Sequence, residues 1–352
     1  MTQPLRVGVV GCGIIGKRYV GDSGAYDAWR PVACADLDTV RAGAFAKEFG
    51  LRAKTVDELI ADPDVDAVLN LTPPAVHASL VRSALEAGKH VYTEKPLATT
   101  ASDGRELLAE AKRRGLRLGC APDTFLGSAY ETARRLIADG TIGTPLGASA
   151  TMLVGGPDAW HPNAEMFYLA GGGPLLDIAP YYLTALVSLL GRIDAVAGFT
   201  ETPTPERTLG AGPRAGHVVA VEVPTYAAAI LRLAGGVLAT LTVGFESRDQ
   251  YVSGMRVFGT AGSLILPDAN AFGGEVLLAV GDRKPEPVRY ESLGDRETRG
   301  LGIQDLAEAL RDDRPHRASG ELALHILEAA EAIARAGDEG RVVELGAIGA
   351  AE

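Results

Sequence analysis

Apolar residues follow two different patterns along this chain of 352 residues. Up to residue 120, short apolar runs typical of buried strands alternate with segments whose apolar positions recur every three to four residues, as in amphipathic helices. The runs predict strands at 5–10, 31–35, 65–71, 90–93 and 116–120, and the periodic segments predict helices at 14–20, 39–49, 76–87 and 100–114. This alternation is typical of an α/β fold with a doubly wound parallel sheet.

After residue 122 the pattern predicts helices at 129–139 and 176–190, a strand at 146–154, and then mostly strands. Residues 227–233 and 237–243 flank Ala234-Gly235-Gly236, which predicts a β-hairpin. Residues 255–258 and 263–266 flank another glycine-containing turn, whereas 201–216 is rich in proline, glycine and threonine and is expected to be a loop. This half therefore predicts an α+β domain with an open, mainly antiparallel sheet.

Helical patterns at 303–310 and 320–335 follow. We therefore predict three segments: an α/β domain over 1–121, an α+β domain over 122–300, and helices and a strand over 301–352 that pack back near the first domain.

Composition narrows the classes of protein to consider. With 47% hydrophobic residues the chain can form two cores, and its apolar stretches are too short for a transmembrane helix. A formal charge of −11 disfavours nucleic-acid binding. The N-terminus leads into a strand pattern without a signal-peptide pattern, so a cytoplasmic location is expected. Cys12, Cys34 and Cys120 lack the spacing of a zinc site or a disulfide framework, so no metal is predicted and they are expected to fill small apolar spaces.

The first predicted strand is followed directly by Gly11-Cys12-Gly13-Ile14-Ile15-Gly16, a G-x-G-x-x-G pattern. Gly11 permits a tight turn, Gly13 lets the backbone approach a pyrophosphate, and Gly16 allows close packing of the helix on the sheet. The free amides at the helix N-terminus then attract the pyrophosphate. Because a strand precedes this motif and a helix follows it, we predict that it binds a dinucleotide.

Asp36 lies twenty positions after Gly16, at the end of the second predicted strand. Its carboxylate can accept hydrogen bonds from the adenosine ribose and would repel a 2′-phosphate, so NAD is predicted over NADP. Arg41 is near enough in sequence to keep NADP as an alternative. A surface acid that caps the following helix is the other interpretation of Asp36, although Asp38 competes for that role.

A second signal, Glu94-Lys95-Pro96, follows another predicted strand of the same domain, at the edge where such sheets bind ligands. With it and the glycine motif, the segments 72–77 (Thr-Pro-Pro-Ala-Val-His), 88–97 (Gly-Lys-His-Val-Tyr-Thr-Glu-Lys-Pro-Leu) and 171–177 (Gly-Gly-Gly-Pro-Leu-Leu-Asp) make the chain resemble the Gfo/Idh/MocA oxidoreductases.

This resemblance implies an N-terminal Rossmann fold, a C-terminal α+β domain that binds substrate and mediates oligomerisation, NAD or NADP as cofactor, and a sugar or polyol as substrate. A homodimer or homotetramer is expected. The resemblance assigns Thr72, Pro73, His77 and Glu94 to the cofactor, and Lys95 to both cofactor and substrate.

The region of Asp177 departs from the commonest family pattern, in which a histidine follows the aspartate by four residues. Here that residue is Tyr181, which resembles the arrangement in glucose-fructose oxidoreductase, and Thr184 stands where a second acid is common. A spacing of four predicts Asp177 and Tyr181 on one helix face. We assign Tyr181 as the acid/base, Lys95 as the charge that stabilises the phenolate and the reacting oxygen, and Asp177 as the orienting group. A core aromatic and a helix-terminal acid are the alternatives for Tyr181 and Asp177.

Three more residues are predicted to contact substrate. Trp160 and His161 lie in a loop-like stretch, where an indole can stack on a sugar ring and an imidazole can bond its hydroxyls; His161 is also the rival acid/base. Asp123 follows the last strand of the first domain, at a place where family counterparts often touch substrate.

The resulting hypothesis is an NAD(P)-dependent oxidoreductase that moves a hydride between the nicotinamide and a secondary hydroxyl or ketone of a sugar, glycoside or cyclitol. Two alternatives stay open: a cofactor-retaining sugar oxidoreductase or epimerase-like enzyme, and a non-catalytic regulator that senses NAD(P). A redox-inert sugar-binding module would require that no cofactor binds.

Overall fold

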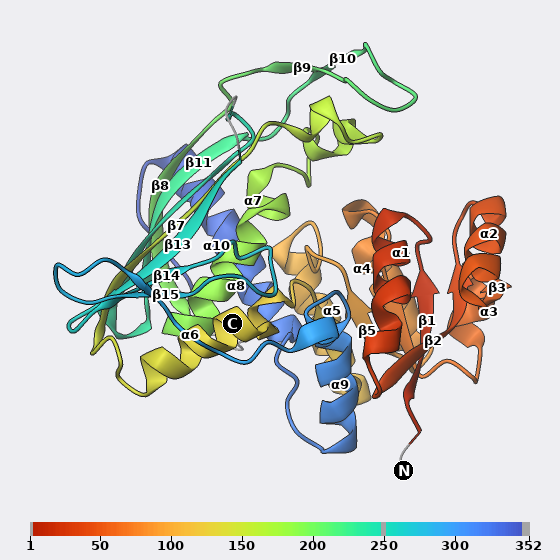
Figure 1. The fold of residues 1–352 in the computed structure, drawn as a ribbon. Helices are drawn as coiled ribbons and strands as arrows, with labels where there is room; N and C mark the ends of the chain where they lie inside the picture. The colour runs from red at the N-terminus through yellow and green to blue at the C-terminus, as the bar shows by residue number, and fades with distance from the viewer. Residues whose placement is uncertain (1–2, 248–250, 347–352) are drawn as a thin grey trace. The chain divides into compact units, whose positions relative to one another are not determined.

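The computed structural model describes residues 3–247 and 251–346. The chain forms two compact units, Met1–Leu126 with Leu293–Leu324 and Gly127–Ser292 with His325–Glu352. Figure 1 colours the chain by residue number, with the first strands in red and orange and the larger sheet in green and cyan. The domain boundaries predicted from the sequence stay predictions.

The first unit is built on a six-stranded parallel sheet in the order β3-β2-β1-β4-β5-β6, which confirms the predicted doubly wound fold. Its strands are β1 (Leu5–Val10), β2 (Trp29–Ala35), β3 (Arg52–Lys54), β4 (Ala67–Asn70), β5 (His90–Thr93) and β6 (Leu118–Cys120). Its helices are α1 (Ile14–Gly21), α2 (Thr39–Phe49), α3 (Val56–Ala61), α4 (His77–Glu86), α5 (Ala101–Arg114) and α9 (Leu301–Arg311), with short 3-10 turns at Asp22–Ala25, Pro74–Val76, Thr124–Leu126 and Gly294–Arg296.

Two apolar clusters form the core of this unit. One contains Val7, Val9, Phe45 and Leu306, and the other contains Val10, Leu59, Leu85 and Leu107. Because successive strand residues point to opposite faces, β1 contributes to both clusters. The strand order reverses between β1 and β4, and such switch points are where doubly wound sheets bind ligands.

The second unit contains a nine-stranded sheet in the order β16-β15-β14-β13-β7-β12-β11-β8-β17. Its strands are β7 (Pro145–Leu153), β8 (Ile193–Glu201), β11 (Tyr226–Leu233), β12 (Leu238–Gly244), β13 (Val252–Gly259), β14 (Ser263–Leu266), β15 (Leu277–Ala279), β16 (Glu286–Pro287) and β17 (Val343–Glu344). Only the pair β7 and β12 is parallel among these described strands, so the predicted mainly antiparallel sheet is confirmed.

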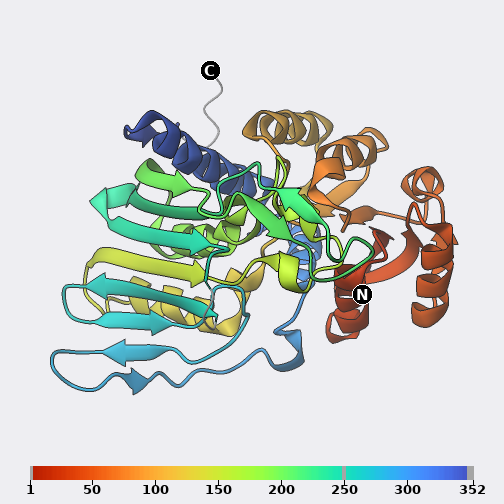
Figure 2. The ribbon, with the colours of Figure 1, turned by 90° about the horizontal axis from the view of Figure 1, so that it is seen from above.

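The helices of this unit are α6 (Ser128–Ala138), α7 (Pro174–Asp177), α8 (Ala179–Leu190) and the larger part of α10 (Gly320–Glu339), with 3-10 turns at Pro157–Ala159, Ala164–Phe167 and Ala234–Gly236. Figures 1 and 2 show α6 and α8 against one face of the nine-stranded sheet, while the described residues place no helix on its other face. The predicted hairpin is present as β11 and β12, and Gly235 in its turn has a positive φ of 74°.

Three differences from the sequence-based expectations stand out. The predicted helix 176–190 is broken at Ile178, because Pro180 has no N–H to continue the hydrogen-bond ladder. The predicted loop 201–216 contains β9 (Glu206–Thr208), which pairs with β10 (Val218–Ala220). The elements β3 and α3 were not predicted, since the exposed Arg-Ala-Lys of β3 gives no apolar run. The strand expected near the C-terminus is present as β17, which pairs with β8 of the second unit.

Candidate active site

The glycine motif forms the turn between β1 and α1. Gly11 has a φ of 105°, and a Cβ on this residue would lie 2.6 Å from the carbonyl oxygen of Leu71. A Cβ on Gly16 would lie 2.5 Å from the carbonyl oxygen of Gly11, so both positions require glycine. A Cβ on Gly13, in contrast, would meet no atom within 4 Å, which leaves this stretch of backbone open to a ligand.

The surroundings of this turn fit a dinucleotide. No side chain caps the N-terminus of α1 and no acidic residue lies in its first turn, so its amides face an anion without competition from a carboxylate. Large apolar side chains are exposed nearby in the chain: Ile14 is 67% exposed and Leu37, next to Asp36, is 94% exposed. Exposed apolar groups at the ends of β1 and β2 offer surface for the apolar parts of a nucleotide.

Asp36 is held at the end of β2 by backbone groups. Its Oδ2 accepts a hydrogen bond from the amide of Cys12 at 2.9 Å, and its Oδ1 accepts one from the amide of Asp38 at 2.9 Å. A carboxylate has about four lone-pair sites, so it can still accept bonds from ribose hydroxyls. Asp38, not Asp36, caps α2 through the amides of Val40 and Arg41. Arg41 lies 3.6 Å from Asp36.

The carboxyl ends of β4 and β5 are joined by side-chain hydrogen bonds. Asn70 donates to Thr93 Oγ1 at 3.1 Å and accepts from the hydroxyl of Thr72 at 2.7 Å, which fixes the backbone of the predicted cofactor segment. Pro73, the next residue of that segment, is exposed. Asn70 is fully buried and was not predicted to take part in the site.

His77 and Glu94 hold the segment of Lys95. The ring of His77 is fully buried, with Nδ1 2.7 Å from the carbonyl oxygen of Pro96 and Nε2 2.7 Å from that of Thr72. Burial lowers the pKa of His77, against the opposing effect of these two carbonyl groups. Glu94 accepts from the backbone amide of Lys95 at 3.0 Å. Lys95 itself is half-buried. A direct contact of His77 with the cofactor stays a prediction.

Asp123 is fully buried, and its Oδ2 accepts from the amide of Gly302 at 2.9 Å. The guanidinium of Arg299 lies 3.6 Å from its Oδ1. Burial raises the pKa of Asp123, while Arg299 opposes this shift. The carboxylate thus connects the segment after β6 to the first turn of α9. Its contact with substrate stays a prediction.

In the second unit, Asp177 ends α7 and Tyr181 lies in the first turn of α8, and Ile178 between the two helices keeps a helical backbone with φ −101° and ψ −49°. Both side chains are half-buried. Burial lowers the pKa of His161 and the charge of Asp177 opposes that shift, which places the two residues within electrostatic reach. Trp160 is 65% exposed, and its ring centroid lies 5.3 Å from that of His161 in an edge arrangement.

The sequence did not reveal the cluster around Asp268. Its carboxylate accepts from the hydroxyl of Tyr182 at 2.7 Å, from the hydroxyl of Tyr251, and from the amide of Asn270 at 2.9 Å. Burial and Asp268 raise the pKa of Tyr251, and Tyr181 adds to this shift. Tyr182 is fully buried in this cluster. Because Asp268 lies 86 residues after Tyr182, no local sequence pattern indicates their contact.

Two kinds of feature, a metal-binding group and a membrane-spanning helix, are absent from the described residues 3–247 and 251–346. They contain no group of three or more histidine, cysteine, aspartate or glutamate side chains that could hold a metal ion. No helix among them combines the length and apolarity needed to cross a membrane. All three cysteines are buried and free.

Comparison with known proteins decides the family. Residues 5–121 match the model of an oxidoreductase family with an NAD-binding Rossmann fold, and residues 130–265 match the GFO/IDH/MocA C-terminal domain. The chain belongs to the Gfo/Idh/MocA oxidoreductases. It is 33% identical, over 88% of its length and 86% of the relative, to a dTDP-3,4-didehydro-2,6-dideoxy-alpha-D-glucose 3-reductase of Streptomyces violaceoruber.

Two further relatives of this family are levoglucosan dehydrogenases. The protein of Pseudarthrobacter phenanthrenivorans is 30% identical over 75% of this chain and 73% of its own. A solved levoglucosan dehydrogenase in complex with NADH and L-sorbose has a TM-score of 0.87 at 24% identity, with 98% of this chain and all of that chain covered. As a Gfo/Idh/MocA protein, the chain is an NAD(P)-dependent oxidoreductase with a Rossmann domain, as the resemblance implied.

Proposed function

We propose that this enzyme oxidises a secondary hydroxyl of a sugar, glycoside or cyclitol, or reduces the corresponding ketone, with NAD as the preferred cofactor. The observation that carries the proposal is the carboxyl edge of the first sheet. There an uncapped helix N-terminus, the carboxylate of Asp36 and the lysine segment Glu94-Lys95-Pro96 follow strands of one parallel sheet. The relatives named above as a keto-sugar reductase and a levoglucosan dehydrogenase support a sugar as substrate.

We propose three roles for the chain's own residues in this reaction. The bound cofactor supplies or accepts the hydride. Tyr181 takes the proton from the substrate hydroxyl or returns it to the alkoxide, since hydride leaves a carbinol carbon only as the hydroxyl proton departs. Lys95 stabilises the negative charge on the reacting oxygen through its ammonium group, and Asp177 orients the substrate through an adjacent hydroxyl.

The geometry of His161 supports Tyr181 as the base. His161 Nδ1 accepts a hydrogen bond from the amide of Asn163 at 3.1 Å, so the neutral ring carries its proton on Nε2. In that form Nε2 can donate to a substrate oxygen but cannot accept the hydroxyl proton. To act as the base, the ring would have to change tautomer and lose the bond from Asn163. We therefore propose that His161, beside the exposed indole of Trp160, binds a substrate hydroxyl.

A spectrophotometric screen tests this function. Purified protein is mixed with NAD or NADP and a panel of sugars, glycosides, levoglucosan and inositols, and the corresponding ketones are tested with NADH and NADPH. We expect turnover with one class of sugar and a higher kcat/KM with NAD. Nicotinamide that stays bound through purification would instead favour the cofactor-retaining enzyme, and cofactor binding without any turnover would favour the regulator.

Substitution of adjacent tyrosines tests the proposed base. Tyr181→Phe is expected to lower kcat by about a hundredfold or more while NADH binding, followed by fluorescence, is kept. Tyr182→Phe is the matched control, because the hydroxyl of Tyr182 donates to Asp268. Near-normal turnover of Tyr181→Phe would exclude Tyr181 as the acid/base.

We also propose that the uncovered face of the nine-stranded sheet pairs two copies of the chain. Exposed apolar side chains on it include Phe199, Ile230 and Leu238, which are 73%, 53% and 54% exposed. Such side chains on adjacent strands are typical of a surface that a second subunit covers. Light scattering should therefore give twice or four times the mass of the chain, and Ile230→Arg should lower it.

A further inference from the structure

The segment that carries Lys95 is held from two sides by residues that the proposed reaction does not use. The first is Tyr19, in the second turn of the helix that begins at the glycine motif. Its side chain is fully buried, and its hydroxyl lies 3.1 Å from Glu94 Oε1. Burial and the charge of Glu94 raise the pKa of Tyr19, so the hydroxyl keeps its proton and donates it to this carboxylate.

Glu94 links Tyr19 to the backbone of Lys95 through its two carboxylate oxygens. While its Oε1 accepts from Tyr19, its Oε2 accepts from the backbone amide of Lys95 at 3.0 Å. Its own amide donates to the carbonyl oxygen of Asn70 at 2.8 Å, which continues the pairing of β4 and β5. One carboxylate therefore connects the helix at the glycine motif to the backbone of the lysine.

His77 holds the other side of the lysine. Its two ring nitrogens lie 2.7 Å from the carbonyl oxygens of Pro96 and Thr72, in the loops after β5 and β4. The first of these carbonyls belongs to the residue directly after Lys95. A neutral imidazole has one N–H, so the ring donates to one of these two carbonyl oxygens at a time. Because the ring is fully buried, water cannot replace that hydrogen bond.

We propose that Tyr19 and His77 are positioning residues for Lys95: Tyr19 through Glu94 and His77 through Pro96 fix the lysine backbone relative to the two loops that hold the cofactor. The inference rests on the proposed role of Lys95. Stabilisation of a developing alkoxide needs the donor within a few tenths of an ångström of its place, so loss of either tie slows the chemical step more than it weakens cofactor binding.

Each positioning residue has a matched control in the same unit. Tyr26 is also buried, but its hydroxyl donates to the carbonyl oxygen of Thr298 at 2.7 Å, away from the lysine segment. His316 is buried, with Nε2 3.1 Å from the carbonyl oxygen of Leu118. Tyr19→Phe is therefore compared with Tyr26→Phe, and His77→Gln with His316→Gln.

The test measures kcat, KM and NADH affinity with the sugar that the screen identifies. Tyr19→Phe is expected to lower kcat by about tenfold or more, with the NADH dissociation constant changed by less than about threefold, and Tyr26→Phe to leave both close to the wild type. His77→Gln should also lower kcat with little change in the NADH dissociation constant. If Tyr19→Phe does not fold, the comparison of His77→Gln with His316→Gln tests the proposal. In Lys95→Met, addition of Tyr19→Phe should cause no further loss, because the two residues act through one group.

A measurement without turnover completes the test. Lysine amines are labelled by reductive methylation with ¹³C, and the signal of Lys95 is assigned by its absence in Lys95→Arg. This signal should shift in Tyr19→Phe and His77→Gln and stay in place in both controls. Equal kinetics and equal spectra for the positioning variants and their controls would overturn the inference, whereas full turnover of Lys95→Met would overturn the proposed function and the inference with it.

Discussion

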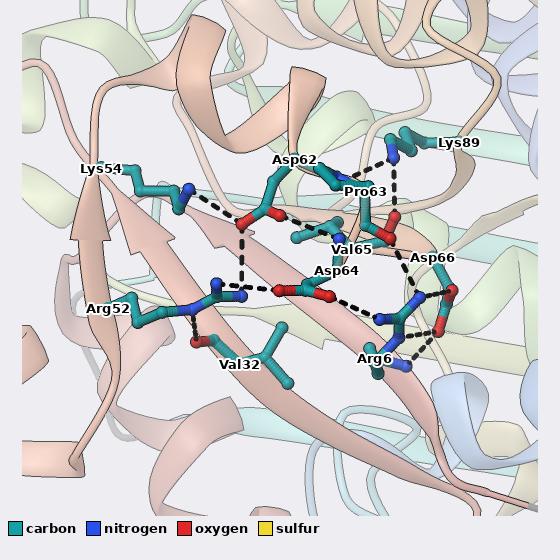
Figure 3. A network of polar contacts seen from close by, with 10 residues as sticks. All are labelled: Arg6, Val32, Arg52, Lys54, Asp62, Pro63, Asp64, Val65, Asp66 and Lys89. Atoms are coloured by element: carbon teal, nitrogen blue, oxygen red, sulfur yellow. Dashed lines mark hydrogen bonds and ion pairs between the residues drawn. The ribbon is translucent and has the colours of Figure 1, made fainter.

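The two ends of strand β4 use their polar side chains in different ways. At its amino end, the carboxylates of Asp62, Asp64 and Asp66 pair with cations from β1 and β3, as Figure 3 shows. Arg6 lies 2.8 Å from Asp66 and Lys54 lies 2.9 Å from Asp62. In addition, the ammonium group of Lys89 donates to the carbonyl oxygens of Asp62 and Val65, both at 2.8 Å.

At its carboxyl end, β4 leads into neutral polar contacts. Asn70 bonds Thr72 and Thr93, and the two ring nitrogens of His77 each lie 2.7 Å from a carbonyl oxygen. The neighbouring glycine turn leaves Gly13 open on one side. The amino end therefore neutralises its charges within the protein, while the uncapped N-terminus of α1 beside the carboxyl end offers backbone amides to an anion. If the proposed roles of Asp36 and Lys95 hold, stability and chemistry reside at opposite ends of the same strands.

The sharpest test of this comparison uses the two lysines that flank β5, Lys89 before it and Lys95 after it. Lys95→Met is expected to lower kcat by about a hundredfold to a thousandfold without a change in melting temperature, because it removes charge from the reacting oxygen. Lys89→Met should keep kcat within about twofold and lower the melting temperature by about 3 °C. Steady-state kinetics and calorimetry of both variants check this, and a loss of turnover in Lys89→Met would contradict the division.

A second test concerns the cofactor at the end of β2. Asp36→Ala should raise the dissociation constant of NAD by about tenfold and leave that of NADP nearly unchanged, since the carboxylate favours only the free ribose hydroxyls. Asp38→Ala is the control, because Asp38 caps α2 and should affect stability alone. Fluorescence titrations of both variants with NADH and NADPH measure these dissociation constants. An equal loss for the two cofactors would mean that Asp36 only supports the glycine turn through Cys12.

The sequence predicted the elements whose side chains are uniformly buried or periodic. β1 and β5 are apolar runs because helices cover both faces of a parallel sheet, and β11 and β12 could be placed because a glycine turn joins them. The role of the glycine motif was also predictable, since only glycine fits Gly11 and Gly16. In these cases a local pattern is enough to define the structure.

Contacts between distant residues could not be predicted in the same way. Tyr19 and Glu94 are separated by 75 positions, and Tyr182 and Asp268 by 86, so their hydrogen bonds leave no mark on local periodicity. The break at Ile178 was missed because the spacing of Asp177 and Tyr181 is compatible with one helix, and only the position of Pro180 opposes it. The prediction of substrate residues in the second unit therefore rests more on the family resemblance than on local sequence patterns.

A third test weakens the amino end of β4. Asp62 is 5% exposed and pairs with Lys54 and Arg52. Asp62→Asn leaves those cations without their carboxylate, so we expect the melting temperature to fall by about 5 °C while kcat/KM of the folded enzyme is unchanged. Asp64→Asn, at a carboxylate whose side chain is 59% exposed, should have a smaller effect. Calorimetry and kinetics at pH 7 separate these outcomes.

The smallest expected effect is the pH dependence of the difference in melting temperature between the wild type and Asp62→Asn. The hydrogen bond from Lys54 lowers the pKa of Asp62 below its ordinary value of 3.8. The unfolded chain therefore binds a proton at higher pH than the folded protein does, so the stabilisation is fully present above about pH 4 and is lost as pH falls through the lower folded pKa. The melting temperatures of wild type and Asp62→Asn should thus converge between about pH 4 and pH 2, measured by calorimetry in buffers of constant ionic strength. A difference in melting temperature that stays constant over this range would show that Asp62→Asn destabilises the loop through lost packing rather than lost charge. The amino end of β4 would then owe its stability to packing instead of ion pairs.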